Sequence, residues 1–127
     1  MTATVWARGD YPKIAVELVG ALGPALVDAC GIEAGQKVLD VAAGTGNAAI
    51  AAAGRGAHVV ASDVTPDLLA AGRERPEAGG LEIEWVEADA QKLPFGDAEF
   101  DVVMSTIGVM FAPNHQACAD EDRKSVV

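Results

Sequence analysis

An apolar run that leads into a glycine-rich turn constrains this chain more than any other feature. Residues 38–47 read VLDVAAGTGN, which predicts a buried strand, a tight turn and the start of a helix. Gly44 and Gly46 allow the turn and let a ligand approach the backbone closely. Asp40 adds a carboxylate just before the turn, which suits a cationic group better than a pyrophosphate.

Three further apolar segments follow this turn. Residues 59–63, 83–89 and 100–104 each predict a strand, and the first two end in Asp63 and Asp89. Helices are expected between strands, over residues 47–54 and over residues 66–75 with Thr65 as the N-cap. This alternation predicts an α/β, Rossmann-like parallel sheet with flanking helices and strand order 3-2-1-4. A ligand is expected where strands 1 and 4 diverge.

Helical patterns also precede and follow this unit. Residues 12–30 carry apolar side chains at four-residue steps, and Pro24 is expected to kink or split that helix. A last helix is expected over residues 113–119.

Composition narrows the class of protein. The 127 residues suffice for one domain with a core, and the net charge of −10 argues against a nucleic-acid partner. Cys30 and Cys118 lack metal-ligand spacing, so no metal site is predicted. Residues 1–10 show no signal-peptide pattern, and charged residues interrupt the apolar region 38–61. We therefore expect a soluble, cytoplasmic protein without a membrane partner.

The ordered segments VLDVAAGTG, ASD, EADAQKLPF and FDVV together resemble the Rossmann-like class I S-adenosylmethionine (SAM) methyltransferases. The resemblance is to the small-molecule methyltransferase-domain group and extends over residues 6–121. It implies SAM as cofactor and in-line transfer of a methyl group to a small-molecule acceptor. The chain departs from the family at Ala42, where a glycine is usual.

The resemblance implies roles for particular residues. Asp40 would face the methionine amino group, directly or through water, while Asp63 would accept hydrogen bonds from the ribose diol. Asp89 would bind the adenine amine and the Ala90 N–H a ring nitrogen. The remaining expected contacts are the loop backbone and the flanks of the cofactor: Ala42, Gly44, Gly46, Val64 and Ser105.

Structural interpretations stand beside several of these roles. The alternative for Asp63 is to cap the next turn, and for Asp89 to begin an Asx-turn. Val64 and Leu93 would pack on the two faces of the adenine or else join the core. Tyr11 would approach the methionine end or simply pack. No catalytic residue is assigned, because His115 is expected at the surface and His58 in a structural place.

Two other functions remain open at this point. Gly44-x-Gly46-x-x-Ala49 also matches the dinucleotide pattern, which suggests an NAD-dependent oxidoreductase. Asp40 and the absence of a Tyr-x-x-x-Lys pair count against it. A non-catalytic nucleotide-binding module is the third possibility.

We divide the chain into an N-terminal helical segment (residues 1–32), a cofactor-binding core (36–121) and a non-native tail (122–127). The tail does not continue the preceding helix and resembles the translation of a common sequencing adaptor. Family members carry later strands, which are missing here, so we expect a longer natural gene with this chain as its N-terminal portion. Re-sequencing the locus tests this expectation, and a genuine stop codon after Val127 would refute it.

Overall fold

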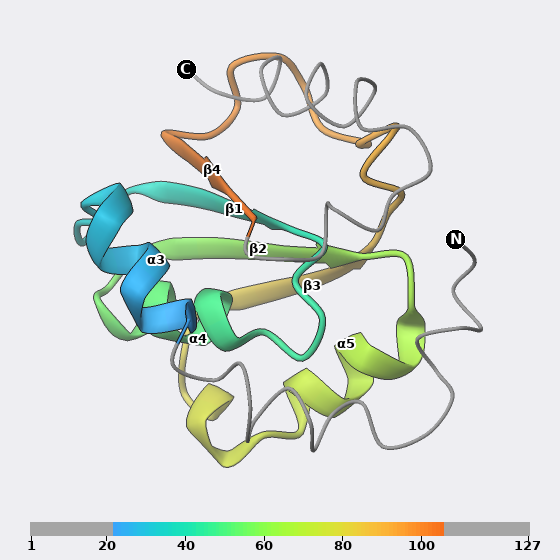
Figure 1. Ribbon diagram of the computed structural model, residues 1–127, viewed down its shortest axis with the longest axis horizontal. Helices are drawn as coiled ribbons and strands as arrows, with labels where there is room; N and C mark the ends of the chain where they lie inside the picture. Colours follow the sequence, from blue (N-terminus) through green and yellow to red (C-terminus); the bar gives the residue numbers. More distant parts are fainter. Residues whose placement is uncertain (1–21, 106–127) are drawn as a thin grey trace.

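The computed structural model describes residues 22–105, which form one four-stranded sheet with helices packed on it. The sheet has the order β3-β2-β1-β4, and every neighbouring pair is parallel (Figure 1). The predicted fold class and strand order are therefore confirmed. The strands are β1 (Lys37–Val41), β2 (His58–Asp63), β3 (Ile83–Glu87) and β4 (Val102–Met104).

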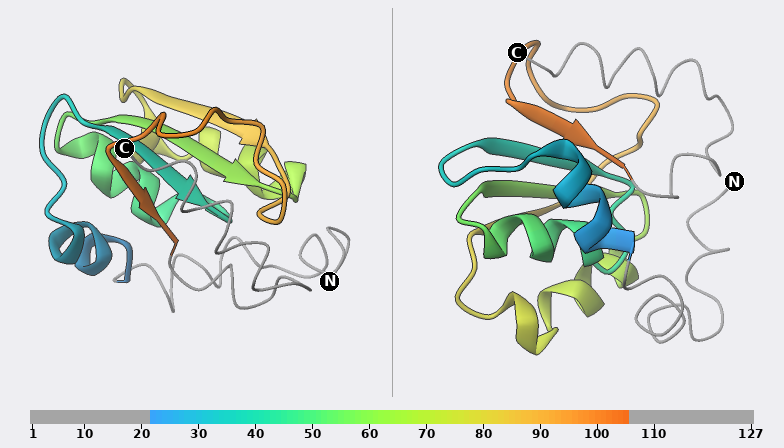
Figure 2. Two further views of the ribbon diagram at one scale, coloured as in Figure 1. Left: turned by 90° about the horizontal axis from the view of Figure 1, so that it is seen from above. Right: turned by 60° about the vertical axis from the view of Figure 1, so that its left-hand side comes forward.

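Three α-helices lie on the same face of this sheet, as the two views of Figure 2 show. They connect or precede the strands as right-handed crossovers require. A short 3₁₀ helix, η1, links the last of them to β3. The bounds are α3 (Leu22–Cys30), α4 (Asn47–Gly54), α5 (Pro66–Arg73) and η1 (Pro76–Ala78).

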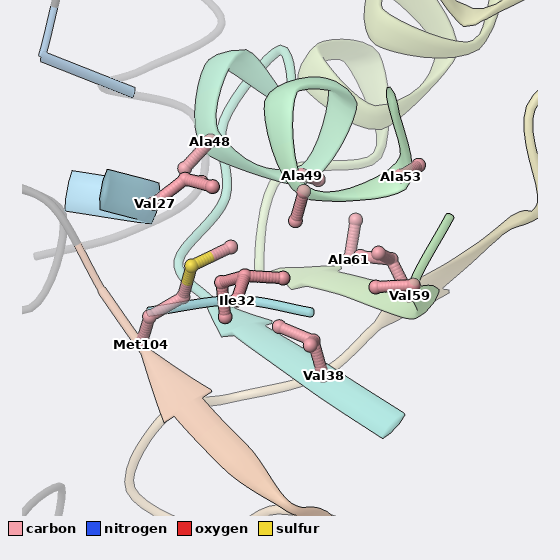
Figure 3. Packing of buried hydrophobic residues seen from close by; sticks show 11 residues of the cluster. Val27, Ile32, Val38, Ala48, Ala49, Ala53, Val59, Ala61 and Met104 are labelled. Atoms are coloured by element: carbon pink, nitrogen blue, oxygen red, sulfur yellow. The ribbon is translucent and has the colours of Figure 1, made fainter. Parts of the chain in front are cut away.

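Small side chains let α4 approach the sheet closely. Ala48, Ala49, Ala52 and Ala53 are buried, and they pack with residues of α3, β1, β2 and β4 (Figure 3). Val27, Val38 and Ala61 are fully buried in this cluster. β1, which precedes the glycine turn, is covered by this cluster on one face and by a second cluster on the other, which explains its nearly continuous buried run.

The opposite face of the sheet carries a second, smaller cluster. Leu39 and Val41 of β1 pack there with Leu93 and Phe100 from the connection between β3 and β4. Phe95 meets Phe100 edge-on, with ring centroids 5.3 Å apart and planes at 89°. Leu93, which the sequence assigned either to the adenine or to the core, is a core residue.

Several predicted boundaries are wrong by a few residues. The helix predicted to reach Arg75 ends at Arg73, because Arg75 is extended, as a residue before a proline prefers. β3 ends at Glu87 and β4 begins at Val102, so both are shorter than predicted. Thr65 holds the N-cap position, but its side chain makes no capping hydrogen bond.

Other predictions fall outside the described residues. These include the helix before Leu22, the final helix, Tyr11, His115 and Cys118. The division of the chain into three segments therefore stays a prediction. Pro24 lies in the first turn of α3 and is exposed, where its missing N–H costs least.

Two helical glycines give opposite predictions for the same substitution. A Cβ at Gly23 would lie 2.6 Å from the Asn47 carbonyl carbon, whereas a Cβ at Gly54 meets nothing within 4 Å. We expect Gly23→Ala to lower the free energy of unfolding by about 1–3 kcal/mol. Gly54→Ala should raise it by about 0.5 kcal/mol through the unfolded chain.

Urea denaturation of both variants beside the parent chain measures the difference. Equal effects of the two substitutions would contradict the close contact between α3 and the start of α4.

Candidate functional site

The turn after β1 alternates between ordinary and left-handed backbone. Ala42, Gly44 and Gly46 have φ values of 56°, 61° and 85°. Glycine adopts this conformation freely, whereas a residue with a Cβ is strained there by about 1–2 kcal/mol. The left-handed φ explains why the family usually has a glycine at position 42. Ala42 adopts the same turn with a strained backbone.

Asp63 fastens this turn to the second β–α unit. Its Oδ2 accepts the Gly44 N–H at 2.9 Å, and its Oδ1 accepts the Thr65 N–H at 2.8 Å. Burial raises the pKa of Asp63, and these N–H groups partly oppose the rise. The Thr65 hydroxyl and the Val64 N–H lower the pKa of this carboxyl as well, so Asp63 is held both from the glycine loop and from the start of the second unit.

Asp40 is a buried carboxylate without a hydrogen-bond partner. Its side chain lies under the start of α4 and is 1% exposed, and neither oxygen makes a hydrogen bond of ordinary geometry. Burial is the main cause that raises the pKa of Asp40 to about 8. The nearby Ala49 N–H lowers this pKa, and the charge of Asp63 adds to the rise. Such a group is costly unless a cation or donor arrives to pair with it.

Two hydroxyl oxygens are likewise buried without a hydrogen-bond partner. Thr45 Oγ1, in the glycine loop, and Ser105 Oγ, just after β4, are buried and make no hydrogen bond. Together with Asp40 they are the unpaired buried side-chain polar atoms found between residues 22 and 105. Asp40 and Ser105 come from the carboxyl ends of β1 and β4, and Thr45 from the turn between β1 and α4. This is the edge at which open parallel sheets bind ligands.

A second group of predicted residues gathers at the ends of β2 and β3. The Ala88 N–H donates to the Asp63 carbonyl at 2.9 Å, which brings the segment with Asp89 and Ala90 beside Val64. Val64 is 37% exposed, which is unusual for a large apolar side chain. It did not join the core, so an apolar surface is left for a ligand.

Asp89 forms the Asx-turn that the sequence offered as its alternative role. Its Oδ1 accepts the Gln91 N–H at 2.8 Å, and its side chain is exposed. The second carboxylate oxygen is the one left to face an amine donor. Both interpretations of Asp89 are thus compatible in one side chain.

The sequence analysis gave no role to three residues that lie behind the glycine loop: Gly72, Arg75 and Trp85. The Trp85 ring occupies the space beside Gly46, where a Cβ would lie 2.5 Å from its Cη2, and it also contacts Gly72. Arg75 donates to the Thr45 carbonyl at 3.2 Å and to Asn47 Oδ1 at 2.6 Å. The alternation of Ile83 and Trp85 shows which face the indole covers, but no pattern in the sequence pairs Arg75 with a loop thirty residues away.

Other titratable groups lie away from this site. His58 pairs with Glu82 at the amino ends of the strands, in the structural place expected for it. Cys30 packs partly buried against the core. Among residues 22–105 no group of three or more His, Cys, Asp or Glu is arranged to hold a metal ion. In that same part of the chain, no helix is long and apolar enough to cross a bilayer.

Comparison with known proteins decides the family. The model of the methyltransferase domain family matches residues 38–125, which is more than half of the chain and includes the site. The chain belongs to this family. Its sheet order and flanking helices are those of a class I, Rossmann-like SAM methyltransferase domain.

Individual relatives agree with this assignment. An uncharacterized Mycobacterium bovis protein is 60% identical over 117 residues, which are 92% of this chain and 43% of the relative. A demethylmenaquinone methyltransferase of Clavibacter sepedonicus is 49% identical over 76 residues, covering 60% of this chain and 31% of that protein. A Bacillus halodurans crystal structure, described as a candidate methyltransferase, has a TM-score of 0.75 and 31% identity, and covers 84% of this chain and 46% of that one.

This methyltransferase domain is therefore matched to only part of each relative. The chain spans less than half the length of the curated relatives that it matches. The comparisons lend no support to an oxidoreductase. The predicted roles of individual site residues stay predictions.

The unpaired Asp40 predicts an unusual dependence of stability on pH. Its pKa is 3.8 when exposed and about 8 in the fold, so between these values the folded chain holds a proton that the unfolded chain has released. Stability is then greatest at the acid end and falls as pH rises toward 8. The raised pKa of Asp63 acts in the same direction.

We expect the melting temperature of the ligand-free chain to fall from about pH 5 to pH 8, corresponding to a loss on the order of 3–4 kcal/mol. Asp40→Asn should remove most of the slope, since the amide does not ionise. Thermal melts of both proteins in a series of buffers measure it. A flat profile for the parent chain would contradict the burial of an unpaired carboxyl.

Proposed function

We propose that this domain binds SAM and serves as the cofactor-binding part of a methyltransferase that acts on a small-molecule acceptor. The observation that carries the proposal is the buried, unpaired carboxyl of Asp40 beside the glycine loop. A buried carboxyl without a partner is suited to a ligand that brings a positive charge, because the cation would stabilise its ionised form. The ammonium group and sulfonium of SAM both meet this requirement, whereas a pyrophosphate does not.

The methionine end of the cofactor is assigned to the region around Asp40. Its ammonium group would pair with the Asp40 carboxylate, and the hydroxyls of Thr45 and Ser105 supply hydrogen bonds for its polar atoms. Gly44 and Gly46 let the ligand lie against the backbone, and Ala42 adds only a methyl group. Binding would satisfy each polar atom that is unpaired in the ligand-free fold.

The nucleoside end is assigned to the ends of β2 and β3. Asp63 would accept hydrogen bonds from the ribose diol at the end of β2, where it already accepts the Gly44 and Thr65 N–H groups. Val64 would pack on the adenine, Asp89 would accept from its amine and the Ala90 N–H would donate to a ring nitrogen. The exposure of Val64 and of Asp89 supports these assignments.

SAM supplies an electrophilic methyl group on a sulfonium when bound. The residues of this chain would hold the cofactor by both ends and exclude water from the sulfur region, so that the methyl group is presented in line to a nucleophile. No side chain among residues 22–105 is assigned as a base. Of the described residues, Ser105 after β4 would lie nearest to the acceptor.

The acceptor class rests on the relatives. One of them is named for demethylmenaquinone, a small molecule. The net charge of −10 favours such an acceptor over a nucleic acid. A non-catalytic nucleotide-binding module remains the second candidate for this chain, because the relatives extend well beyond it. The cytoplasmic location stays a prediction.

A thermal melt with S-adenosylhomocysteine (SAH) and with NAD tests the cofactor. A ligand that binds only the folded state stabilises it by about 2.7 kcal/mol at a hundredfold excess over its dissociation constant. We expect SAH to raise the melting temperature and NAD to leave it unchanged.

Asp40→Asn is the matched control, because it removes the charge and nearly preserves the volume. The SAH-induced shift should shrink in this variant at neutral pH, whatever its own melting temperature. A shift with NAD alone would refute the proposal, and turnover of labelled SAM distinguishes an enzyme from a binding module.

A further inference from the structure

Arg75 lies behind the glycine loop in an arrangement that its place in the sequence does not suggest. It follows α5, and its side chain is 18% exposed. Nη1 donates to the Thr45 carbonyl at 3.2 Å and to Asn47 Oδ1 at 2.6 Å, while Nε donates to Glu77 Oε2 at 2.9 Å. One guanidinium thus bonds to the loop, to the first residue of α4 and to an acidic neighbour.

We infer that Arg75 is a positioning residue, which fixes the glycine loop in its ligand-binding shape and so sets the affinity for the methionine end of the cofactor. The inference rests on the proposed function, because the loop is taken to bind SAM. Arg75 donates to the loop from the side of α5 and η1, and no direct contact with the ligand is proposed for it.

Asp63 holds the Gly44 N–H and the Ala43 carbonyl accepts the Gly46 N–H, so the Thr45 carbonyl is the group of the loop that Arg75 holds. Gly46 is the N-cap of α4, has a left-handed φ and makes no side-chain capping hydrogen bond. Thr45 sits between two left-handed glycines, the residues that restrict the backbone least. A charge-assisted hydrogen bond to the Thr45 carbonyl removes part of that freedom.

Van der Waals packing also supports the glycine loop, from Gly72 and Trp85. Gly72 contacts the Thr45 carbonyl, since a Cβ there would lie 2.7 Å from that oxygen, and the Trp85 ring lies beside Gly46. The peptide that joins Thr45 to Gly46 is bonded at both ends: its N–H donates to the Ala43 carbonyl at 3.0 Å, and its carbonyl accepts from Arg75. Arg75 also bonds to Asn47 on the other side of Gly46 and so completes the constraint on the orientation of the turn.

The electrostatics favour a positioning role over simple stabilisation of α4. A cation beside a helix N-terminus is unfavourable toward the helix dipole. Arg75 is nevertheless held there, and Glu77 offsets its charge. Its place is therefore explained by the two acceptors that it meets rather than by the helix.

The effect should be confined to one end of the cofactor. Arg75 holds Thr45, whose hydroxyl is unpaired and lies in the region assigned with Asp40 to the methionine end. The nucleoside end depends on Asp63 and Val64, which β2 positions directly. Loss of Arg75 should therefore weaken ligands that carry the amino-acid group more than ligands that lack it.

Calorimetric titration of the full chain, well below its melting temperature, tests this with two ligands. SAH carries the amino-acid end, whereas 5′-methylthioadenosine has the adenine and ribose without it. We expect Arg75→Gln to raise the dissociation constant of SAH about tenfold, as loss of a charge-assisted hydrogen bond does, and that of methylthioadenosine less than about twofold. Arg75→Lys, which keeps a charged donor, should retain most of the affinity for SAH.

Arg73→Gln is the matched control, with the same change on the exposed end of α5, and both dissociation constants should stay as in the parent chain. Equal weakening of the two ligands by Arg75→Gln, or no weakening, would overturn the inference. Failure of the parent chain to bind SAH would instead refute the proposed function. If Arg75→Gln does not fold, Glu77→Gln is used, and a smaller loss confined to SAH is expected.

Discussion

The buried carboxylate of Asp63 is the interaction on which the arrangement of this domain depends. It joins two strand–helix units by accepting one N–H from the loop after β1 and another from the start of α5. Neither N–H would find a partner within its own segment, because both lie where the chain leaves regular structure. The same side chain thereby ties the Gly44 end of the loop to the start of the second helix.

The architecture could be predicted because it follows from local patterns that agree with one another. Apolar strands alternate with short helices, which admits few topologies besides a parallel sheet, and the order β3-β2-β1-β4 was predicted on that ground. Element ends were less predictable. The sequence predicts a helix that reaches Arg75, whereas Arg75 is extended before Pro76 and leads into η1.

The acidic residues of the site were predictable because each ends a strand, and strand ends converge at one edge of a parallel sheet. Arg75 and Trp85 were not, because their importance arises only when α5 and β3 fold against the loop. Ala42 illustrates the intermediate case. Its departure from the family was visible in the sequence, but the strain became evident only with a φ of 56°.

The outer strand β3 has a consequence for how copies of this domain meet. Within the described part of the chain it pairs on one side only, with β2, and Glu82, Glu84 and Glu87 are exposed along it. A second copy that approached this edge to extend the sheet would bring the same row of negative charges opposite the first. Repulsion between the rows disfavours edge-to-edge growth, so the acidic composition protects the domain against aggregation at the place where a parallel sheet is most exposed to it.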